Sequence, residues 1–213
     1  MTADKIAPYA LTIGTRFELG LSWITPSLGI LAQTRPERTL HLSFGDGEDM
    51  VERVRTYQVD ASVTSSRNLP PGAQYATLHQ EEYVFVSRRA LINRSPLGSA
   101  SDAANHTLVD INAELPLFRY FLDGQAGKTP WIFGRVEKLG TIAAIRHRVL
   151  EGKGVAVLPK YFVEDDLKRR RLINVFPKKR LKTDAFRLVW MSDHPRQEAL
   201  LQLSEDLRAI PLT

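Results

Sequence analysis

Residues 141–159, TIAAIRHRVLEGKGVAVLP, decide the fold of this chain. Ile142, Ile145 and Val149 recur at helical spacing, which predicts a helix over 141–151 with one buried stripe. Gly152 follows directly, at the position where helices commonly end on a glycine in the left-handed conformation. The apolar run VAVL (155–158) then predicts a buried strand. The order is therefore helix, glycine turn, strand.

Two glycines around a lysine also resemble a phosphate-binding loop, but the order of the elements argues against that function. In a phosphate-binding loop the strand precedes the glycines and a helix follows them, so that backbone amides face the anion. Here the helix comes first, and Arg146, His147 and Arg148 lie late in it, where they complement its negative end. Carbonyl groups, which repel an anion, therefore face the turn at Gly152.

The alternation of helix and strand extends along the whole chain. Apolar patterns predict strands at 11–14, 40–44, 61–64, 107–111, 132–139, 155–158, 172–176 and 186–191, and extended segments over 75–87. They predict helices at about 19–34, 48–57, 114–122, 141–151, 160–168 and 194–210, with a connection over 88–105. Pro26 interrupts the first of these helices unless that helix begins there. Alternating strands and helices predict an α/β fold with parallel strands.

Two similar α/β units with a ligand cleft between them follow from this repeated order. The expected first unit comprises 10–87 plus 190–213, because the final helix is expected to return to it, and the second comprises 88–189. A length of 213 residues allows each unit a buried core.

Composition places the chain among ordinary globular proteins of a reducing compartment. Hydrophobic residues make up 43% and charged residues 25% of the sequence, and no apolar run approaches the roughly 20 residues that cross a bilayer. The start, MTADKIAPYA, has no secretory pattern. Cysteine is absent, which excludes disulfides and thiolate chemistry. We therefore expect a cytoplasmic protein that does not bind a membrane.

The net charge of +5 raises the question of nucleic-acid binding. The basic runs KRRR (168–171) and KKRLK (178–182) have few aromatic residues between them on which a base could stack, and the first follows the acidic VEDD (163–166). We expect both runs to form solvated surface rather than a nucleic-acid interface.

Signatures of catalysis and metal binding are missing from the sequence. There is no G-x-S-x-G, H-E-x-x-H or G-x-x-x-x-G-K-[ST] motif, and the five histidines have no ligand spacing. GDGEDMVE (45–52) lacks the third glycine of a dinucleotide fingerprint, and its acidic residues would repel a pyrophosphate. It is better interpreted as a turn with acidic residues at a helix start. We expect no enzyme activity, no metal and no cofactor.

Ligands of α/β sheets bind at the loops that follow the carboxyl ends of the strands. These loops are small, polar and carry two arginines, Arg16 and Arg67, which suit a carboxylate. For any one of these residues, a solvated side chain or a helix cap is an equally good interpretation. The candidate ligand-binding residues are Thr15, Arg16, Phe17, Gly45, Asp46, Ser65, Ser66, Arg67, Ile111, Asn112, Gly140, Thr141 and Pro159.

The order of motifs resembles the effector-binding domain of LysR-type transcriptional regulators. The segments that carry the resemblance are LTIG (11–14), residues 33–66 with QVDASVT (58–64), and residues 140–177 with the GKGVAVLP strand. The resemblance covers about 11–210. It implies two Rossmann-like subdomains joined by two crossover strands, as in type 2 periplasmic binding proteins, with a small-molecule effector in the cleft. The family's ligand loops fall on the strand-end loops named above, by position.

The resemblance also implies pairing into homodimers or tetramers. These residues include no winged helix-turn-helix, so we expect no specific operator binding by this chain alone, which is either an excised fragment or a free-standing relative. VTSSR (63–67) is more polar than the usual strand end, so effector chemistry does not carry over from relatives. The alternatives are a solute-binding protein of a transporter, opposed by the missing export signal, and a transferase such as a phosphoribosyltransferase, opposed by the missing phosphate loop.

Overall fold

A computed structural model describes residues 7–125 and 129–212, and the chain forms two compact units. Unit 1 comprises the residues up to Gln80 and from Asp184 onward, and unit 2 comprises Glu81–Thr183. Unit 2 is thus one continuous segment inserted into unit 1. The sequence led us to expect the boundaries between the units at 87/88 and 189/190, which is six to seven residues later in the chain than the observed boundaries at 80/81 and 183/184. The difference at the first crossing is one strand, 83–87, which pairs within unit 2.

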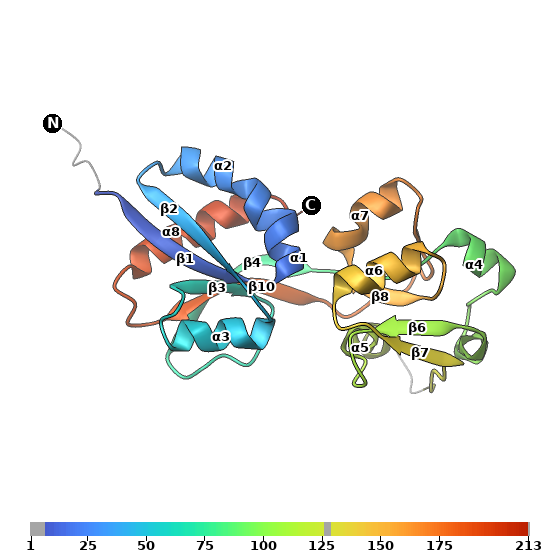
Figure 1. The fold of residues 1–213 in the computed structure, drawn as a ribbon. Coiled ribbons are helices and arrows are strands. Elements are labelled where there is room, and N and C mark those ends of the chain that lie inside the picture. Colours follow the sequence, from blue (N-terminus) through green and yellow to red (C-terminus); the bar gives the residue numbers. More distant parts are fainter. Residues whose placement is uncertain (1–6, 126–128, 213) are drawn as a thin grey trace. The chain divides into compact units, whose positions relative to one another are not determined.

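Unit 1 is built on a five-stranded sheet with the order β2-β1-β3-β10-β4 (Figure 1). Its strands are β1 (Tyr9–Thr15), β2 (Arg38–Phe44), β3 (Ala61–Thr64), β4 (Ala73–Glu81) and β10 (Asp184–Met191). β1 pairs in parallel with both β2 and β3, whereas β10 is antiparallel to β3. The predicted parallel core of the first unit is therefore confirmed, and β4 and β10 carry the chain between the units.

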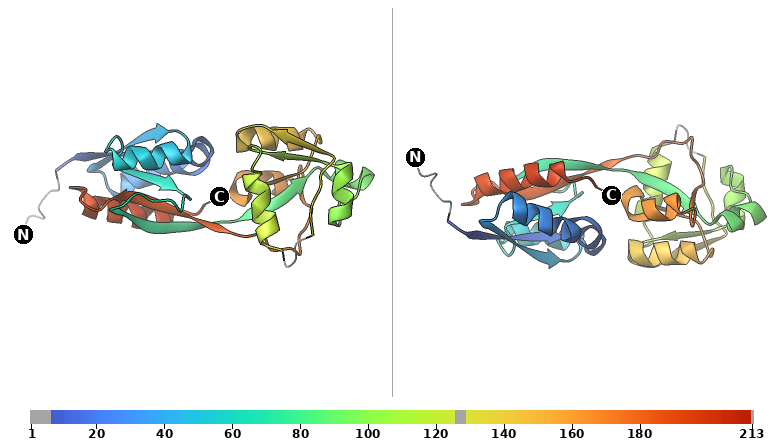
Figure 2. Two further views of the ribbon diagram at one scale, coloured as in Figure 1. Left: turned by 90° about the horizontal axis from the view of Figure 1, so that it is seen from below. Right: turned by 90° about the horizontal axis from the view of Figure 1, so that it is seen from above.

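Helices cover both faces of this sheet. They are α1 (Phe17–Leu19), the π-helical η1 (Gly20–Ile24), α2 (Thr25–Thr34), α3 (Gly47–Arg55) and α8 (Gln197–Ala209). α3 lies on one face, and α2 and α8 lie side by side on the other (Figures 1 and 2). A buried ion pair joins β2 to α8, because Arg38 Nη1 lies 2.8 Å from Asp206 Oδ2. The final helix returns to the first unit, as the sequence predicted.

Pro26 does not begin the first helix of unit 1. The chain is helical without a break from Phe17 to Thr34, and Pro26 lies at its middle. An α-helical proline removes one hydrogen bond and crowds the carbonyl four residues before it. The π-helical turn just before it widens the helix, with Thr25 N–H donating to the Gly20 carbonyl. This local widening lets one helix run through the proline.

Unit 2 contains two small sheets joined by a bridge. β8 (Ala156–Pro159), β5 (Tyr83–Ser87) and β9 (Ile173–Asn174) form one, and β6 (Thr107–Asp110) and β7 (Arg135–Lys138) form the other. β6 and β7 are parallel, and a parallel bridge between Leu108 and Val155 connects β6 to the start of β8. β5 is antiparallel to β8 and β9, as expected for the strand in which the chain enters the unit.

The helices of unit 2 enclose an aromatic core. They are α4 (Arg89–Arg94), the 3-10 helix η2 (Ala100–Asn105), α5 (Pro116–Asp123), α6 (Ile142–Leu150) and α7 (Lys160–Lys168). The rings of Phe85, Phe118 and Phe121 are buried and lie 5.0 to 6.1 Å apart. The connection expected over 88–105 contains two short helices, α4 and η2. No helix in the described parts of the chain is long and apolar enough to span a membrane.

The glycine turn after α6 has the predicted form. Gly152 has a φ of +74°, its N–H donates to the Val149 carbonyl, and the Lys153 N–H donates to the Arg148 carbonyl. These two bonds define the Schellman motif that ends many helices. Thr107 O lies 2.8 Å from the position that a Cβ at Gly154 would take, so the second glycine permits close packing on β6. Both glycines of this stretch are structural.

Candidate functional site

Three of the predicted loops converge at one edge of unit 1. Because β1, β2 and β3 are parallel, their carboxyl ends lie together, and Thr15 pairs with Phe44 on one side and Val63 on the other. The Gly45 N–H donates to the Thr15 carbonyl at 3.1 Å, which fixes the second loop against the first. We call this group of loops, 15–17, 45–46 and 65–67, the unit 1 edge.

Exposed side chains dominate the unit 1 edge. The Arg16 guanidinium carbon lies 5.7 Å from the centroid of the Phe186 ring, in cation–π contact. Phe17 is 54% exposed, and its ring stacks on Phe44 with 5.5 Å between centroids. Thr15 is fully buried beneath them. The edge therefore presents the Arg16 guanidinium packed on Phe186 and, from the next residue, the half-exposed ring of Phe17.

The remaining predicted residues of unit 1 add polar groups to this edge. The Ser66 N–H is held by Thr64 Oγ1 at 3.0 Å. Arg67 Nε lies 3.3 Å from Asp184 Oδ2, but the Arg67 side chain is 57% exposed, so this ion pair is weak. Asp46 is exposed at the N-cap position of α3, where its side chain makes no capping bond. Asp46 thus lies at the start of α3, as the sequence predicted, and stabilises the helix through its negative charge at the positive end of the helix dipole rather than through a hydrogen bond.

The loops of unit 2 also meet at one edge, and backbone bonds hold them. The Leu139 N–H donates to the Asp110 carbonyl and the Gly140 N–H to the Ile111 carbonyl, both at 3.0 Å. Gly140 has a φ of +76°, which L side chains rarely adopt. Thr141 caps α6, because its hydroxyl accepts the Ala144 N–H at 3.2 Å. We call the loops 111–112, 139–141 and residue 159 the unit 2 edge.

Two predicted residues of the unit 2 edge, Asn112 and Pro159, have local structural roles. Asn112 is exposed, and its Oδ1 accepts the Glu114 N–H at 3.0 Å in a tight turn. Pro159 is buried at the end of β8, where it pairs with Tyr83 and precedes α7. The structure thus brings the predicted residues together within each unit. Their role in ligand binding stays a prediction.

Sequence reasoning missed Asp110, the residue that organises the unit 2 edge. Its carboxylate is buried and accepts three backbone N–H groups: Ile111 at 2.6 Å, Phe118 at 2.9 Å and Leu117 at 3.3 Å. Burial raises the pKa of Asp110, and these hydrogen bonds oppose that rise. A lone acidic residue closing the apolar strand TLVD, just before a proline-led helix, is the sequence signal that could have found it.

The histidines form no shared site where the structure describes them. His79 packs edge-on against Trp23, the His106 ring lies 3.3 Å from Ser95 Oγ, and His194 Nε2 lies 2.9 Å from Asp60 Oδ1. Within 7–125 and 129–212, no group of three or more histidine, aspartate or glutamate side chains could hold a metal ion. The candidate site consists of the two edges.

Comparison with known proteins gives the same fold. The sequence model of the LysR substrate binding domain matches residues 9–210. The regulatory domain of CrgA, a LysR-type transcriptional regulator from Neisseria meningitidis, is similar with a TM-score of 0.79 at 16% identity, covering 95% of this chain and 98% of that chain. The chain also spans 69% of a longer CrgA structure, with a TM-score of 0.80.

Two further structures have the same arrangement of elements. The effector domain of AmpR from Pseudomonas aeruginosa has a TM-score of 0.73 at 18% identity, covering 94% of both chains. The reduced regulatory domain of OxyR2 from Vibrio vulnificus has a TM-score of 0.79 at 15% identity, covering 100% of both chains. No curated protein matches in sequence. Because the family match spans nearly the whole length, the chain belongs to the LysR substrate-binding domain family, the ligand-sensing part of LysR-type transcriptional regulators.

Proposed function

We propose that the unit 1 edge and the unit 2 edge both contribute to the binding of one small-molecule effector. The observation that carries this proposal is the convergence of strand-end loops within each unit, at the place where α/β sheets bind their ligands. Unit 1 would recognise the effector through Arg16, Phe17 and Arg67. Unit 2 would supply the backbone and hydroxyl groups of Ile111, Gly140 and Thr141.

The unit 1 edge favours an anionic effector with an apolar body. Arginine binds a carboxylate through two parallel hydrogen bonds, and the half-exposed ring of Phe17 adds apolar surface to the same edge. The Arg67–Asp184 pair is exposed, so an incoming carboxylate can replace it at small cost. Asp46, an exposed carboxylate at the same edge, would repel further negative charge, so the proposed effector carries a single carboxylate.

Effector binding would regulate by differential affinity for two conformations of the domain. In an intact LysR-type regulator, that shift would reach DNA through a winged helix-turn-helix, and the domains would act as homodimers or tetramers. We propose no catalytic role for this chain, and we place its action in the cytoplasm, where a regulator of this family meets DNA. The family identification favours this role over a transport protein.

Thermal-shift screening with small carboxylates, aromatic compounds and amino acids tests the proposal. A ligand at 100 times its dissociation constant stabilises the folded chain by about 2.7 kcal/mol. We expect a carboxylate to raise the melting temperature and the neutral amide of the same compound to leave it unchanged. Arg16→Ala and Arg67→Ala are each expected to weaken binding at least tenfold, about the contribution of one charge-assisted hydrogen bond.

Arg55→Ala is the matched control for both arginine variants. Arg55 is exposed on α3 of the same unit, where it pairs with Glu52, and lies outside the unit 1 edge. Each melting shift is measured against the unliganded form of the same variant. Full retention of every ligand's shift in both Arg16→Ala and Arg67→Ala would show that the unit 1 edge is not the effector site.

A further inference from the structure

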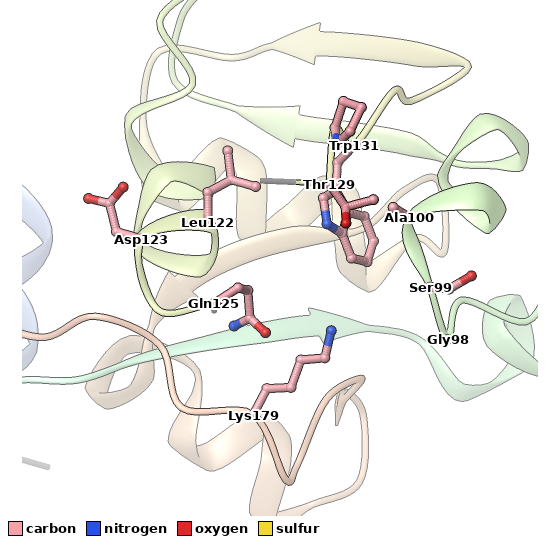
Figure 3. A pocket seen from close by; sticks show the side chains of 10 residues that line it. Gly98, Ser99, Ala100, Leu122, Asp123, Gln125, Thr129, Trp131 and Lys179 are labelled. Atoms are coloured by element: carbon pink, nitrogen blue, oxygen red, sulfur yellow. The ribbon is translucent and has the colours of Figure 1, made fainter. Parts of the chain in front are cut away.

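Unit 2 contains a cavity of about 580 Å³ (Figure 3). It is lined by Ser99 before η2, by Leu122 and Gln125 at the end of α5, and by Trp131 and Lys179. Its volume falls within the range of small-molecule sites in proteins. Size alone assigns no ligand, so the lining decides what the cavity can bind.

The cavity lies at the opposite end of the strands from the unit 2 edge. Ser99 and η2 lead into the start of β6, and Trp131 precedes the start of β7. α5 begins after the carboxyl end of β6, runs back along the sheet and ends at the cavity. The unit 2 edge follows the carboxyl ends of the same strands. A ligand in this cavity would therefore leave the unit 2 edge free.

A lysine of the chain lies over a cluster of three aromatic rings at the cavity wall. Lys179 Nζ lies 4.7 Å from the centroid of Phe176, 5.2 Å from Phe121 and 5.4 Å from Trp131. Within the basic run KKRLK (178–182), Lys179 is half-buried, whereas Lys178, Arg180 and Lys182 are exposed. Because the rings already hold this ammonium group, a ligand cation would have to displace it, whereas an anion would be attracted to it.

The backbone holds Lys179 in place beside α5. The Lys182 N–H donates to the Tyr120 carbonyl at 2.8 Å, and Lys182 Nζ lies 2.9 Å from Asp123 Oδ2. A Cβ at Gly124 would lie 2.5 Å from the Arg180 carbonyl oxygen, so the two backbones touch and only glycine fits there. The segment that carries Lys179 therefore has a fixed position beside α5.

The charge around Lys179 is not neutralised by the described residues. Asp123, the acidic residue in the cavity lining, is paired with Lys182, and in Figure 3 its carboxylate points away from Lys179. Asp102, behind the Ser99 wall, accepts the Gly98 and Ser99 N–H groups and the Ser99 hydroxyl, which hold its pKa below the usual value. In the described ranges no carboxylate lies within ion-pair distance of Lys179 Nζ.

We propose that this cavity is a second ligand site, which takes a small planar organic anion with one carboxylate. The carboxylate would bind Lys179 Nζ, and the planar body would lie against Trp131, which is half-buried and lines the cavity. A partly buried ammonium makes charge-assisted hydrogen bonds that are stronger than neutral ones. This proposal is independent of effector binding at the two edges.

Tryptophan fluorescence offers a selective test, because Trp131 is the tryptophan of unit 2. Trp23 and Trp190 belong to unit 1 and are buried to 2% and 1% exposure, so a small ligand does not reach them. The chain is titrated with sodium benzoate, with benzamide as a neutral compound of the same shape and with benzylammonium as a cation. We expect saturable quenching by benzoate only. The Arg16→Ala/Arg67→Ala double variant is expected to bind benzoate at this site unchanged.

Lys179→Met keeps the apolar stem over the rings and removes the charge, and is expected to weaken benzoate binding at least about tenfold. Lys179→Arg, which retains a cation, is expected to stay within about fivefold of the parent, and Lys178→Met, an exposed neighbour, within about twofold. Trp131→Phe is expected to abolish the quenching signal. Equal binding of benzamide, an unaffected Lys179→Met, or quenching that persists in Trp131→Phe would each overturn the proposal.

Discussion

The two edges at the strand ends differ in what they offer a ligand. The unit 1 edge presents long side chains, Arg16, Phe17 and Arg67, of which Phe17 and Arg67 are more than half exposed. The unit 2 edge is held by the buried carboxylate of Asp110 and by the left-handed backbone of Gly140. The unit 1 edge therefore offers a ligand mainly exposed side chains, whereas the unit 2 edge offers mainly backbone groups held in a defined conformation.

Because of this difference, we expect the unit 1 edge to determine ligand specificity and the unit 2 edge to contribute more to the folding stability of the chain. Exposed side chains that make few internal contacts can be exchanged with little loss of folding free energy. Residues that satisfy buried amides or occupy unusual backbone conformations cannot. Ligand preference should therefore vary easily at the unit 1 edge, whereas the unit 2 edge should tolerate few substitutions. Three experiments test this contrast.

Asp110→Ala should have the largest effect. It leaves the N–H groups of Ile111, Leu117 and Phe118 without their acceptor, and we expect the free energy of unfolding to fall by about 2–4 kcal/mol. Asp46→Ala, at the unit 1 edge, removes an exposed carboxylate without a capping bond and should cost less than about 1 kcal/mol. Urea denaturation of both variants checks the pair. Equal losses would mean that the two edges do not differ in this way.

Gly140→Ala should have an intermediate effect that comes from the backbone alone. No atom lies within 4 Å of the position of a Cβ at Gly140, but its φ is +76°, so alanine there should cost about 1 kcal/mol. Gly29 in α2 has the same open surroundings and a helical backbone, so Gly29→Ala should stabilise the chain by about 0.5–1 kcal/mol. Melting temperatures should move in opposite directions. A shift of the same sign in both variants would remove backbone strain as the explanation.

Arg67→Ala should have the smallest effect on stability. Its ion pair with Asp184 is exposed, so the expected loss is below about 0.5 kcal/mol, although the same variant should lose anion affinity. Denaturation and ligand titration on one sample separate the two quantities. A loss above about 1 kcal/mol would make Arg67 a structural residue and weaken the contrast between the edges.

Most elements followed from periodicity, and the exceptions have physical causes. A proline normally ends or begins a helix, but the π-helical turn at Gly20–Ile24 carries the chain through Pro26, and no local pattern announces such a turn. Serine, asparagine and proline over 88–105 favour turns, yet the apolar Leu91, Ile92 and Leu97 pack against the core of unit 2 and fix two short helices there. Tertiary packing overrode local preference in both places.

The sequence allowed us to predict which loops form the candidate site, but not how individual side chains are arranged in it. Strand ends can be located from the sequence because parallel strands share one direction, and this placed Arg16, Asp46 and Gly140 correctly at their edges. The role of Asp110 depends on amides from residues 111–118 that meet it only in the folded unit. The cavity at Lys179 draws its walls from 98–179, so no single stretch of sequence indicates it.

The insertion of unit 2 into unit 1 determines the order in which the sheet of unit 1 can be completed during synthesis. β10 lies between β3 and β4 in that sheet, and it leaves the ribosome only after all of Glu81–Thr183. The nascent chain must therefore carry an incomplete sheet, with the β3 and β4 edges unpaired, while unit 2 emerges and folds. Open strand edges are the surfaces through which chains aggregate. Synthesis from β4 to β10 is therefore the interval in which the nascent chain exposes the unpaired strand edges of unit 1.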